Sequence, residues 1–305
     1  MTKYVIKRIG YAFLTIFLIS VITFSLMNMI PGGPFLSEKP VSAATTEALN
    51  KKYGLDKPMY VQYLNYMSNL LQGDFGLSIK QPGRTANDII FSTFPVSARL
   101  GGISILVALI LGIVMGSVAA LNRGKWGDNV LMLVSTLGIA VPSFVVATFL
   151  LMFFGVNLRW LPTIGLKTPM HYILPVATLS FYPMAYITRL MRSSMLDALN
   201  QDYIRTARAK GVSGFWILFK HAMRNAIIPI ITYVGPLLAF TVTGSFVVEK
   251  IFTIPGLGRE FINCISGRDY PMVMSTTIFL AVLLVFMNVL VDIAYKLVDP
   301  RIKLK

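Results

Sequence analysis

Long apolar stretches alternate with shorter polar ones along most of this chain. Asp, Glu, Lys and Arg are absent from six windows, which span residues 9–30, 100–121, 130–158, 172–188, 225–248 and 270–291. A helix that rises about 1.5 Å per residue needs about 20 residues to cross a hydrocarbon layer about 30 Å thick. Because each window is near that length, the pattern predicts six transmembrane helices and an all-α integral membrane protein. Prolines inside the windows predict kinked helix axes, and they are Pro142, Pro175, Pro183, Pro229 and Pro236.

The largest polar segment lies between the first two windows and spans residues 31–95. Two short helices are predicted in it, the first over residues 45–53. The second has Asp56 as its N-cap, Pro58 in its first turn and its end before Gly73. Helical spacing gives this second helix one apolar face, formed by Tyr60, Tyr63, Leu64, Met67, Leu70 and Leu71. The face either packs on the outer ends of the membrane helices or contacts an external protein.

The composition is also that of a membrane protein. The chain of 305 residues is 55% hydrophobic and only 13% charged, against about 25% charged residues in an average soluble domain. The formal net charge of +15 would suit nucleic acid, but no soluble basic domain is present to carry it, and no nucleic-acid partner is expected. The single Cys264 excludes an internal disulfide, and no Cys and His pair has metal-ligand spacing. We therefore expect no metal or other cofactor on this chain.

Basic residues orient the chain in the membrane. Lys3, Lys7 and Arg8 precede the first window, and seven Lys or Arg residues lie within residues 189–224. Because cytoplasmic loops are enriched in Lys and Arg, both segments are placed in the cytoplasm, and six spans put the C-terminus there too. A cleaved signal peptide is the alternative for the first window, which is longer than the 7–15 residues typical of a signal h-region. The expected parts are a cytoplasmic N-terminus at 1–8, a first span at 9–30, an external segment at 31–95 and a membrane core at 96–305.

Residues 202–219, between two windows, have the pattern of two short helices bent at a glycine. The first part favours helix, with Tyr203, Ile204 and Ala207 on one face and Arg205, Arg208 and Lys210 around the other. Gly211 interrupts it, and an apolar segment from Phe215 follows. Ala207 and Gly211 leave a shallow place where the backbone of a partner can approach closely. The segment is either a docking surface for a soluble protein or an interfacial helix on lipid headgroups.

Residues 202–211, Asp-Tyr-Ile-Arg-Thr-Ala-Arg-Ala-Lys-Gly, resemble the EAA loop of bacterial ABC importer permeases, in the form carried by the peptide-uptake branch. The whole chain is similar to this branch, and most of all to the B-type subunits of oligopeptide permeases. The shared motifs occur in the expected order, with Pro-Gly-Gly-Pro at 31–34, Gly-Leu-Asp-Lys-Pro at 54–58, Gly-Asp-Phe-Gly at 73–76, Trp-Leu-Pro at 160–162, Pro-Gly-Leu-Gly at 255–258, Arg-Asp-Tyr-Pro at 268–271 and Asp-Pro-Arg-Ile at 299–302. The chain departs from the general pattern at Arg205, Thr206 and Ala207, where the family has Glu-Ala-Ala.

The resemblance implies a type I ABC importer permease fold with a cytoplasmic coupling loop at 189–224. It implies import of oligopeptides across the bacterial cell membrane, with dipeptides, nickel complexes or glutathione as alternative cargo. The implied partners are a second, homologous permease subunit in a heterodimer, two cytoplasmic ATPase subunits that bind ATP and Mg, an external peptide-binding protein and the lipid bilayer. The residues expected to couple to the ATPases are Asp202, Tyr203, Arg205, Thr206, Ala207, Arg208, Ala209, Lys210 and Gly211.

The chain itself is not expected to be an enzyme. A P-loop requires Gly-x4-Gly-Lys-Ser/Thr, and the one Gly-Lys pair, Gly124-Lys125, is followed by Trp126. An ion-coupled secondary transporter is the alternative from another class, but such proteins usually carry ionisable residues inside the membrane, and the six windows have none. Candidates for a wet path are Thr136, Ser143, Tyr182, Tyr186, Thr241 and Thr243, which are equally suited to hydrogen bonds between helices or to the backbone.

Overall fold

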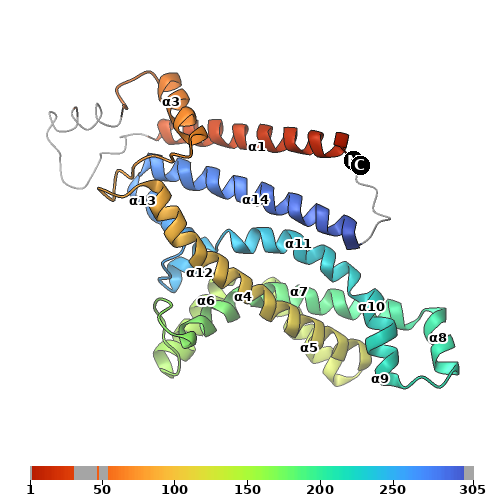
Figure 1. The fold of residues 1–305 in the computed structure, drawn as a ribbon. Helices are drawn as coiled ribbons and strands as arrows, with labels where there is room; N and C mark the ends of the chain where they lie inside the picture. The colour runs from red at the N-terminus through yellow and green to blue at the C-terminus, as the bar shows by residue number, and fades with distance from the viewer. Residues whose placement is uncertain (1, 31–46, 48–53, 299–305) are drawn as a thin grey trace.

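The computed structural model describes residues 2–30, 47 and 54–298, and these residues form helices but no strands (Figure 1). The helices are α1 (Thr2–Met29), α3 (Met59–Leu71), α4 (Ala86–Leu121), α5 (Trp126–Ala140), α6 (Ser143–Leu150), η1 (Leu151–Asn157), η2 (Pro169–Tyr172), α7 (Ile173–Leu199), α8 (Asp202–Ala209), α9 (Gly214–Trp216), η3 (Ile217–Ala222), α10 (Met223–Ala226), α11 (Ile228–Val242), α12 (Phe246–Ile251), α13 (Leu257–Gly267) and α14 (Tyr270–Val298). The predicted all-α fold is confirmed. Apart from residue 47, the helix predicted over 45–53 lies outside the described residues.

Four stretches in the described part of the chain are long and apolar enough to cross a membrane, and they are Gly10–Met29, Ala86–Leu121, Ile228–Ile251 and Tyr270–Val291. The predicted window at 130–158 is not one continuous helix. Instead, α5 and the segment of α6 and η1 meet at an angle of 106°, and Pro142 is the N-cap of α6. Because proline has no N–H to donate, α5 cannot continue through it. This segment is a broken span or a re-entrant loop, and the total of six spans stays a prediction.

α4 is the longest helix and begins inside the segment 31–95 that was expected to be an external loop. Thr85 and Asp88 form a reciprocal capping box at its start: the Asp88 N–H donates to Thr85 Oγ at 3.0 Å, and the Thr85 N–H donates to the Asp88 carboxylate at 3.3 Å. This arrangement satisfies backbone donors that an uncapped helix end would leave free. The capping box therefore sets the start of α4, ahead of the apolar window.

Glycines bring α4 into close contact with α7. A Cβ atom at Gly112 would collide with Ile187, and one at Gly116 with Met191. Small residues of this kind let two membrane helices approach closely, so that dispersion contacts hold them together without a contribution from water. Ile187 and Met191 are fully buried. The pair of α4 and α7 therefore forms the centre of the bundle.

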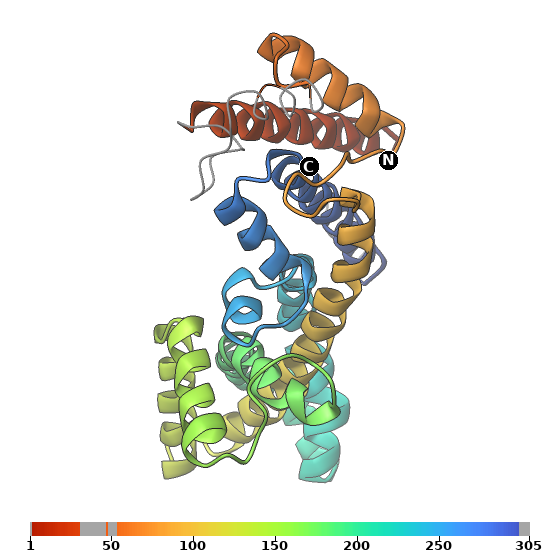
Figure 2. The same ribbon diagram turned by 90° about the vertical axis from the view of Figure 1, so that its left-hand side faces the viewer.

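The long helices run between two ends of the molecule, which carry different short elements (Figure 1). α1 and α14 pack side by side at one edge, and α5 and α6 lie at the opposite edge, as Figure 2 shows from the end that carries α3 and α13. α8, α9 and α10 lie at the other end, where the N-terminal end of α1 is also found (Figure 1). One end of the bundle therefore carries the polar connections α3 and α13, and the other end carries the predicted elbow.

α3 packs on α1 and α14. Tyr63 makes a hydrogen bond of 2.7 Å with Ser20 of α1, and Tyr66 makes one of 3.1 Å with Ser275 of α14. Burial raises the pKa of the Tyr66 phenol to about 12, so it stays neutral. Packing on the membrane helices is thus confirmed, although three residues of the predicted apolar face are exposed, namely Tyr60, Leu64 and Leu71. The N-cap is Pro58, so the capping role predicted for Asp56 is wrong.

Candidate functional site

The helix–glycine–helix pattern predicted for residues 202–219 is present. α8 ends at Ala209, and Gly211 has a φ of +76°. The Gly211 N–H donates to Arg208 O at 3.0 Å, and the Val212 N–H donates to Ala207 O at 3.2 Å. These bonds close α8 with a left-handed turn, in which glycine has no steric penalty because it lacks a Cβ atom. The chain then returns through α9, η3 and α10.

One face of α8 is packed against the returning chain. Ile204 and Ala207 are buried and belong to the same cluster as Ile217, Leu218 and Ala222. The shallow place expected at Ala207 is therefore filled by the chain's own side chains and is not open to a partner. The cluster also includes Met191 and Met195 of α7. Because close-packed interiors transmit displacements, a movement of α8 is expected to move η3 and α10 with it.

The remaining predicted coupling residues are exposed and form what we call the elbow surface, made up of Asp202, Tyr203, Arg205, Thr206, Arg208, Ala209, Lys210 and Gly211. Within it, Arg205 and Asp202 lie 3.5 Å apart, and the Tyr203 hydroxyl accepts a hydrogen bond of 2.8 Å from Asn225. Beside it, three aromatic side chains are more than half exposed, namely Phe215, Trp216 and Phe219. A basic face beside exposed aromatic rings has the chemistry of a docking site, either for a protein or for lipid headgroups.

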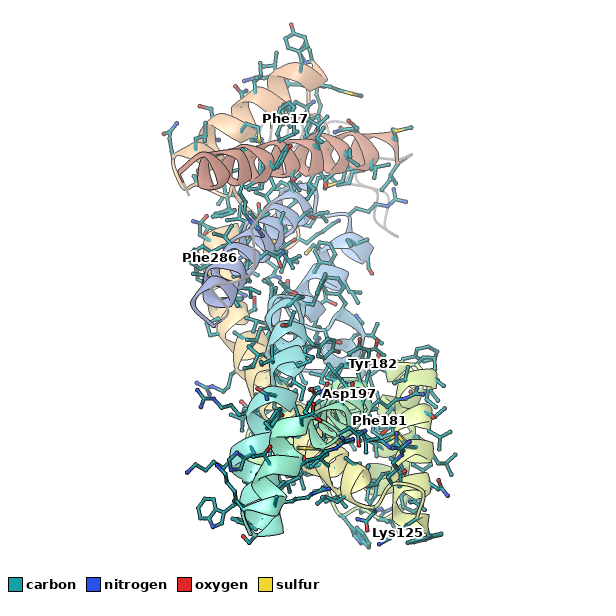
Figure 3. All side chains as sticks on the ribbon, turned by 90° about the vertical axis from the view of Figure 1, so that its right-hand side faces the viewer. Phe17, Lys125, Phe181, Tyr182, Asp197 and Phe286 are labelled. Carbon is teal, nitrogen blue, oxygen red and sulfur yellow. The ribbon has the colours of Figure 1, made fainter. Side chains whose placement is uncertain are left out.

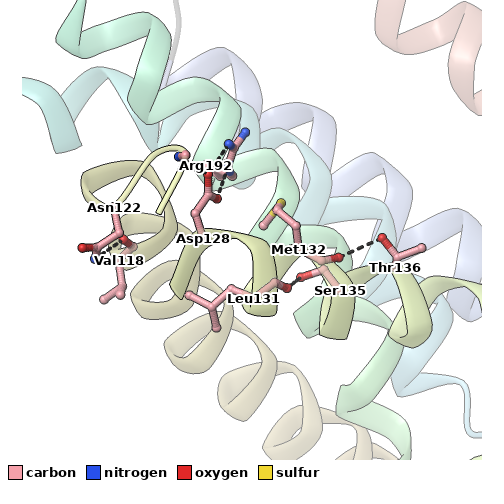
Figure 4. Close-up of polar contacts among 9 residues, drawn as sticks. Val118, Asn122, Asp128, Leu131, Met132, Ser135, Thr136 and Arg192 are labelled. Atoms are coloured by element: carbon pink, nitrogen blue, oxygen red, sulfur yellow. Dashed lines mark hydrogen bonds and ion pairs between the residues drawn. The ribbon is translucent and has the colours of Figure 1, made fainter. Parts of the chain in front are cut away.

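α7 connects the elbow to the bundle and continues past the predicted window to Leu199. Near its end, Arg192 donates from Nε to Asp128 Oδ1 and from Nη2 to Asp128 Oδ2, each at 2.6 Å (Figure 4). The Gly124 N–H donates to the same carboxylate at 2.9 Å. A bidentate pair of this kind fixes both distance and orientation, so it holds α7 to the start of α5. The sequence analysis missed this pair, because its partners lie 64 positions apart.

At the opposite end of the molecule, Glu249 is fully buried. Its carboxylate accepts backbone hydrogen bonds from Ser245 at 3.2 Å and from Arg259 at 3.1 Å. A Cβ atom at Gly256 would collide with this carboxylate, and one at Gly258 would press on it. The Pro-Gly-Leu-Gly motif is thus explained physically: it has no side chain where the backbone must approach the carboxylate of Glu249.

A second buried carboxylate, that of Asp269, ties the turn at residues 78–80 to the start of α14. Ser78 Oγ donates to Asp269 Oδ2 at 2.5 Å, and the backbone N–H groups of Ile79 and Lys80 donate at 3.1 and 3.2 Å. Three donors compensate for the loss of hydration around a buried carboxylate. This accounts for the aspartate in the Arg-Asp-Tyr-Pro motif at 268–271.

The six polar candidates for a wet path differ in their surroundings. The hydroxyls of Thr136, Thr241 and Thr243 donate to carbonyls of their own helices at 2.6–2.8 Å. Ser143 is exposed at the start of α6, and Tyr182 and Tyr186 are partly exposed on α7, where Tyr186 stacks on Tyr233. Figure 3, seen from the end that carries α8, places Tyr182 and Asp197 between Phe286 and Lys125. Three of the six candidates therefore make hydrogen bonds within their own helices, which is the alternative role that the sequence allowed.

Four charged residues lie inside the stretches that are long and apolar enough to cross a membrane, namely Asp88, Arg99, Glu249 and Lys250, and the two nearest to the predicted windows are Arg99 and Glu249. Arg99 belongs to the stretch Ala86–Leu121, and Glu249 belongs to the stretch Ile228–Ile251. Each lies one position outside a window defined by the absence of charge, which is why the windows missed both. The charge-free windows therefore do not by themselves argue against ion coupling.

In the described residues, no group of three His, Cys, Asp or Glu side chains could hold a metal ion.

Apolar helices, a bent helix pair and an amphipathic elbow at one end define a multi-pass membrane protein of the permease class. The family described as "Binding-protein-dependent transport system inner membrane component" matches residues 108–304. A second family, described as the N-terminal part of the membrane component of binding-protein-dependent transport systems, matches residues 1–86. The chain belongs to this family, and it is a permease subunit of an ABC importer. The resemblance found in the sequence is confirmed.

Named relatives cover the full length of the chain. The dipeptide transport system permease protein DppB of Bacillus subtilis is 48% identical over 100% of this chain and 99% of the relative. The oligopeptide transport system permease protein OppB of Haemophilus influenzae is 43% identical over 99% of this chain and 100% of the relative. The glutathione transport system permease protein GsiC of Escherichia coli K12 is 39% identical over 100% of each. All three relatives are named as permease proteins of transport systems.

Solved structures share the fold at low sequence identity. The MetNI methionine ABC transporter matches with a TM-score of 0.54 at 17% identity, over 69% of this chain and 94% of that chain. An amino acid ABC transporter crystallised with histidines matches with a TM-score of 0.56 at 16% identity, over the same two fractions. At these identities the likeness concerns the fold alone, and it confirms the predicted type I ABC importer permease fold.

Proposed function

We propose that this permease carries short peptides into the cell as one half of a heterodimeric pore. The observation that supports this cargo is the full-length similarity to permeases named for dipeptides, at 48% identity, and for oligopeptides, at 43%. Glutathione, named for a third relative, is itself a tripeptide. The class of short peptides therefore includes the expected oligopeptide cargo and two of the alternatives, dipeptides and glutathione.

The energy comes from outside this chain in our proposal. Two cytoplasmic ATPase subunits bind ATP and Mg²⁺, and an external peptide-binding protein delivers the cargo. The elbow surface docks on an ATPase subunit, and the buried Ile204 and Ala207 pass the movement of α8 to η3 and α10. The bidentate pair of Arg192 and Asp128 then carries it from α7 to α5.

The rigidity of these contacts matters because of the energy that they must transmit. Shifting a two-state equilibrium from 1:99 to 99:1 takes about 5.5 kcal/mol of differential binding. A loosely attached loop would yield before it transmitted that much. The packed elbow and the ion pair of Asp128 are connections that can transmit it.

The elbow lies in the cytoplasm in this proposal, and so do both chain termini. The N-terminal end of α1 lies at the same end of the bundle as α8 (Figure 1), which supports a common side for these two segments. Seven Lys or Arg residues within 189–224 favour the cytoplasm for that side.

The test is transport by the complete importer in proteoliposomes. This chain, its partner permease and both ATPases are reconstituted, the binding protein and labelled di- and tripeptides are added on its side, and ATP is supplied on the other. Uptake is expected to require ATP and to persist after ionophores have collapsed all ion gradients. Vesicles that lack the ATPases serve as the control. Uptake in that control, or uptake abolished by the ionophores while ATP is present, contradicts the proposal.

A further inference from the structure

A basic pocket of about 630 Å³ lies between α4, the segment before η2, and the turn that follows α12. This volume is in the range of small-ligand sites, about 300–1,000 Å³. The side chains that matter for its chemistry are those of Arg99, Lys167, His171, Tyr172 and Thr253. No Asp or Glu is among the described residues that line it.

Arg99 has a charge that its surroundings do not balance. It is exposed, and among the described residues it makes no hydrogen bond or ion pair. It lies 13 residues after the start of α4, or about 20 Å along the helix axis, within the membrane-spanning stretch Ala86–Leu121. Ionisable residues inside such stretches normally pair with an opposite charge or mark the path of a substrate.

His171 adds a further nitrogen donor to the pocket. Its Nδ1 accepts a hydrogen bond of 3.2 Å from the Thr168 N–H, which leaves Nε2 as the ring nitrogen that can donate to a ligand. Lys167 is exposed at the same rim. The pocket therefore offers a guanidinium, an ammonium and an imidazole N–H, which are all donors. A planar guanidinium matches a carboxylate through two parallel hydrogen bonds.

The walls of the pocket are held in place before any ligand binds. The Gly165 N–H donates to Phe252 O at 3.0 Å, and Arg259 Nη1 donates to Thr253 O at 3.1 Å. Thr253 has a φ of +53°, a left-handed conformation that is unfavourable for a β-branched residue and persists only where the surroundings impose it. The same turn adjoins α12, whose Glu249 is locked to the start of α13.

We propose that this pocket binds the free C-terminal carboxylate of a peptide in transit, with Arg99 as its main partner. The inference rests on the proposed import of peptides, because every unmodified linear peptide has this group. The phosphate of an anionic lipid headgroup has the same oxyanion chemistry, and the experiment must separate the two sources.

The test combines two peptides with two permease variants in the complete importer described above. Tri-alanine is supplied either as the free acid or as its C-terminal amide, and the half-saturating concentration for uptake is measured with wild type and with Arg99→Gln. A hydrogen bond to a charged group corresponds to about a tenfold change or more in binding. We expect Arg99→Gln to raise the half-saturating concentration about tenfold for the acid and to leave that for the amide unchanged. The binding protein is the same in both experiments, so its own preference for acid or amide cancels when the two permeases are compared in a double-mutant-type cycle.

Further variants guard against a purely structural effect. Arg99→Lys keeps the charge and is expected to retain part of the preference for the acid. If Arg99→Gln does not assemble, Lys167→Gln replaces it in the test, and this variant is expected to reduce the preference for the acid. Lys80→Gln removes an exposed lysine outside the pocket and should leave the preference intact.

Three results would overturn the inference. An equal loss of uptake for acid and amide excludes recognition of the carboxylate. A loss that appears in vesicles containing phosphatidylglycerol and disappears in pure phosphatidylcholine assigns the pocket to a lipid headgroup. A wild-type importer that transports neither peptide with ATP overturns the proposed function, and the inference with it. Uptake of the amide by Arg99→Gln at the wild-type rate distinguishes failure of the site from failure of transport.

Discussion

Asp128 and Asp202 show how strongly the worth of an ion pair depends on its surroundings. The Asp128 side chain is only 3% exposed and binds Arg192 in bidentate fashion at 2.6 Å. The Asp202 side chain is 94% exposed and lies 3.5 Å from Arg205. Solvent screens an exposed pair and leaves it with little effect on stability. Removing one partner of a buried pair leaves an uncompensated charge.

Replacing Asp128 by Asn is therefore expected to destabilise the permease by about 1–3 kcal/mol. The estimate lies below the 3–5 kcal/mol for a fully buried pair, because Arg192 is 26% exposed. The thermal unfolding midpoint of the purified permease should fall by several degrees, whereas Asp202→Asn should leave it unchanged. Equal midpoints for the two variants would show that the pair does not hold α7 to α5.

Single residues also show where sequence reasoning fails. Arg205 and Arg208 were correctly separated from Ile204 and Ala207, because helical spacing alone distinguishes the faces of a helix. Tyr203 was grouped with Ile204 and Ala207, but it is exposed whereas they are buried. Asp128, Glu249 and Asp269 were not singled out as structural centres. Their partners come from distant parts of the chain, and nothing in the local sequence records which backbone N–H will reach a carboxylate.

Among the elements, α8 depends most on its neighbours. A helix of 8 residues is marginal in isolation, because nucleation is unfavourable and few hydrogen bonds repay it. Its stability comes from Ile204 and Ala207 packed against η3, and its direction comes from the turn at Gly211. The element works as a rigid lever only while both features are intact.

Gly211→Leu and Gly211→Asn separate the role of the turn from that of the helix. No atom lies within 4 Å of a Cβ built at Gly211, so the penalty is conformational, about 1–2 kcal/mol for a left-handed residue. Asn adopts this conformation more readily than Leu. We expect the Leu variant to insert into the membrane and to lower the ratio of peptide transported to ATP hydrolysed several-fold. The Asn variant should keep that ratio, and a normal ratio in the Leu variant would rule out the proposed lever.

The break between α5 and α6 shows the limit of prediction for whole elements. Pro142 predicted a kink, and the structure has a bend of 106° at that place. Loss of one hydrogen bond explains why the helix stops. The size of the bend depends instead on how α5 and α6 each pack against α7, and a proline alone does not encode this.

At the scale of the whole molecule, the orientation in the membrane decides which partner meets which end. The one native cysteine makes this easy to test. Cys264 is only 4% exposed, and burial raises the pKa of its thiol to about 12. Since the thiolate is the reactive form, the native chain should remain unlabelled by thiol reagents.

Cysteines placed at the two ends should report opposite sides. Lys210→Cys on the elbow surface and Lys80→Cys near α13 are both at exposed positions. With a membrane-impermeant maleimide, we expect Lys80→Cys to react in intact spheroplasts and Lys210→Cys to react only after permeabilisation. The native chain is the blank. Labelling of Lys210→Cys from outside would place the elbow on the wrong side for an ATPase.

The sequence by itself determined that this is an α-helical membrane protein with a glycine-bent elbow. Those features depend on the apolar content of short windows and on residues a few positions apart, and both are local properties. The tertiary structure alone decided that Ala207 packs in the buried core, that Asp128 binds Arg192, and that Arg99 lines a basic pocket. Each of these depends on distant segments meeting in space, and the energy of such a contact exists only once the chain has folded around it.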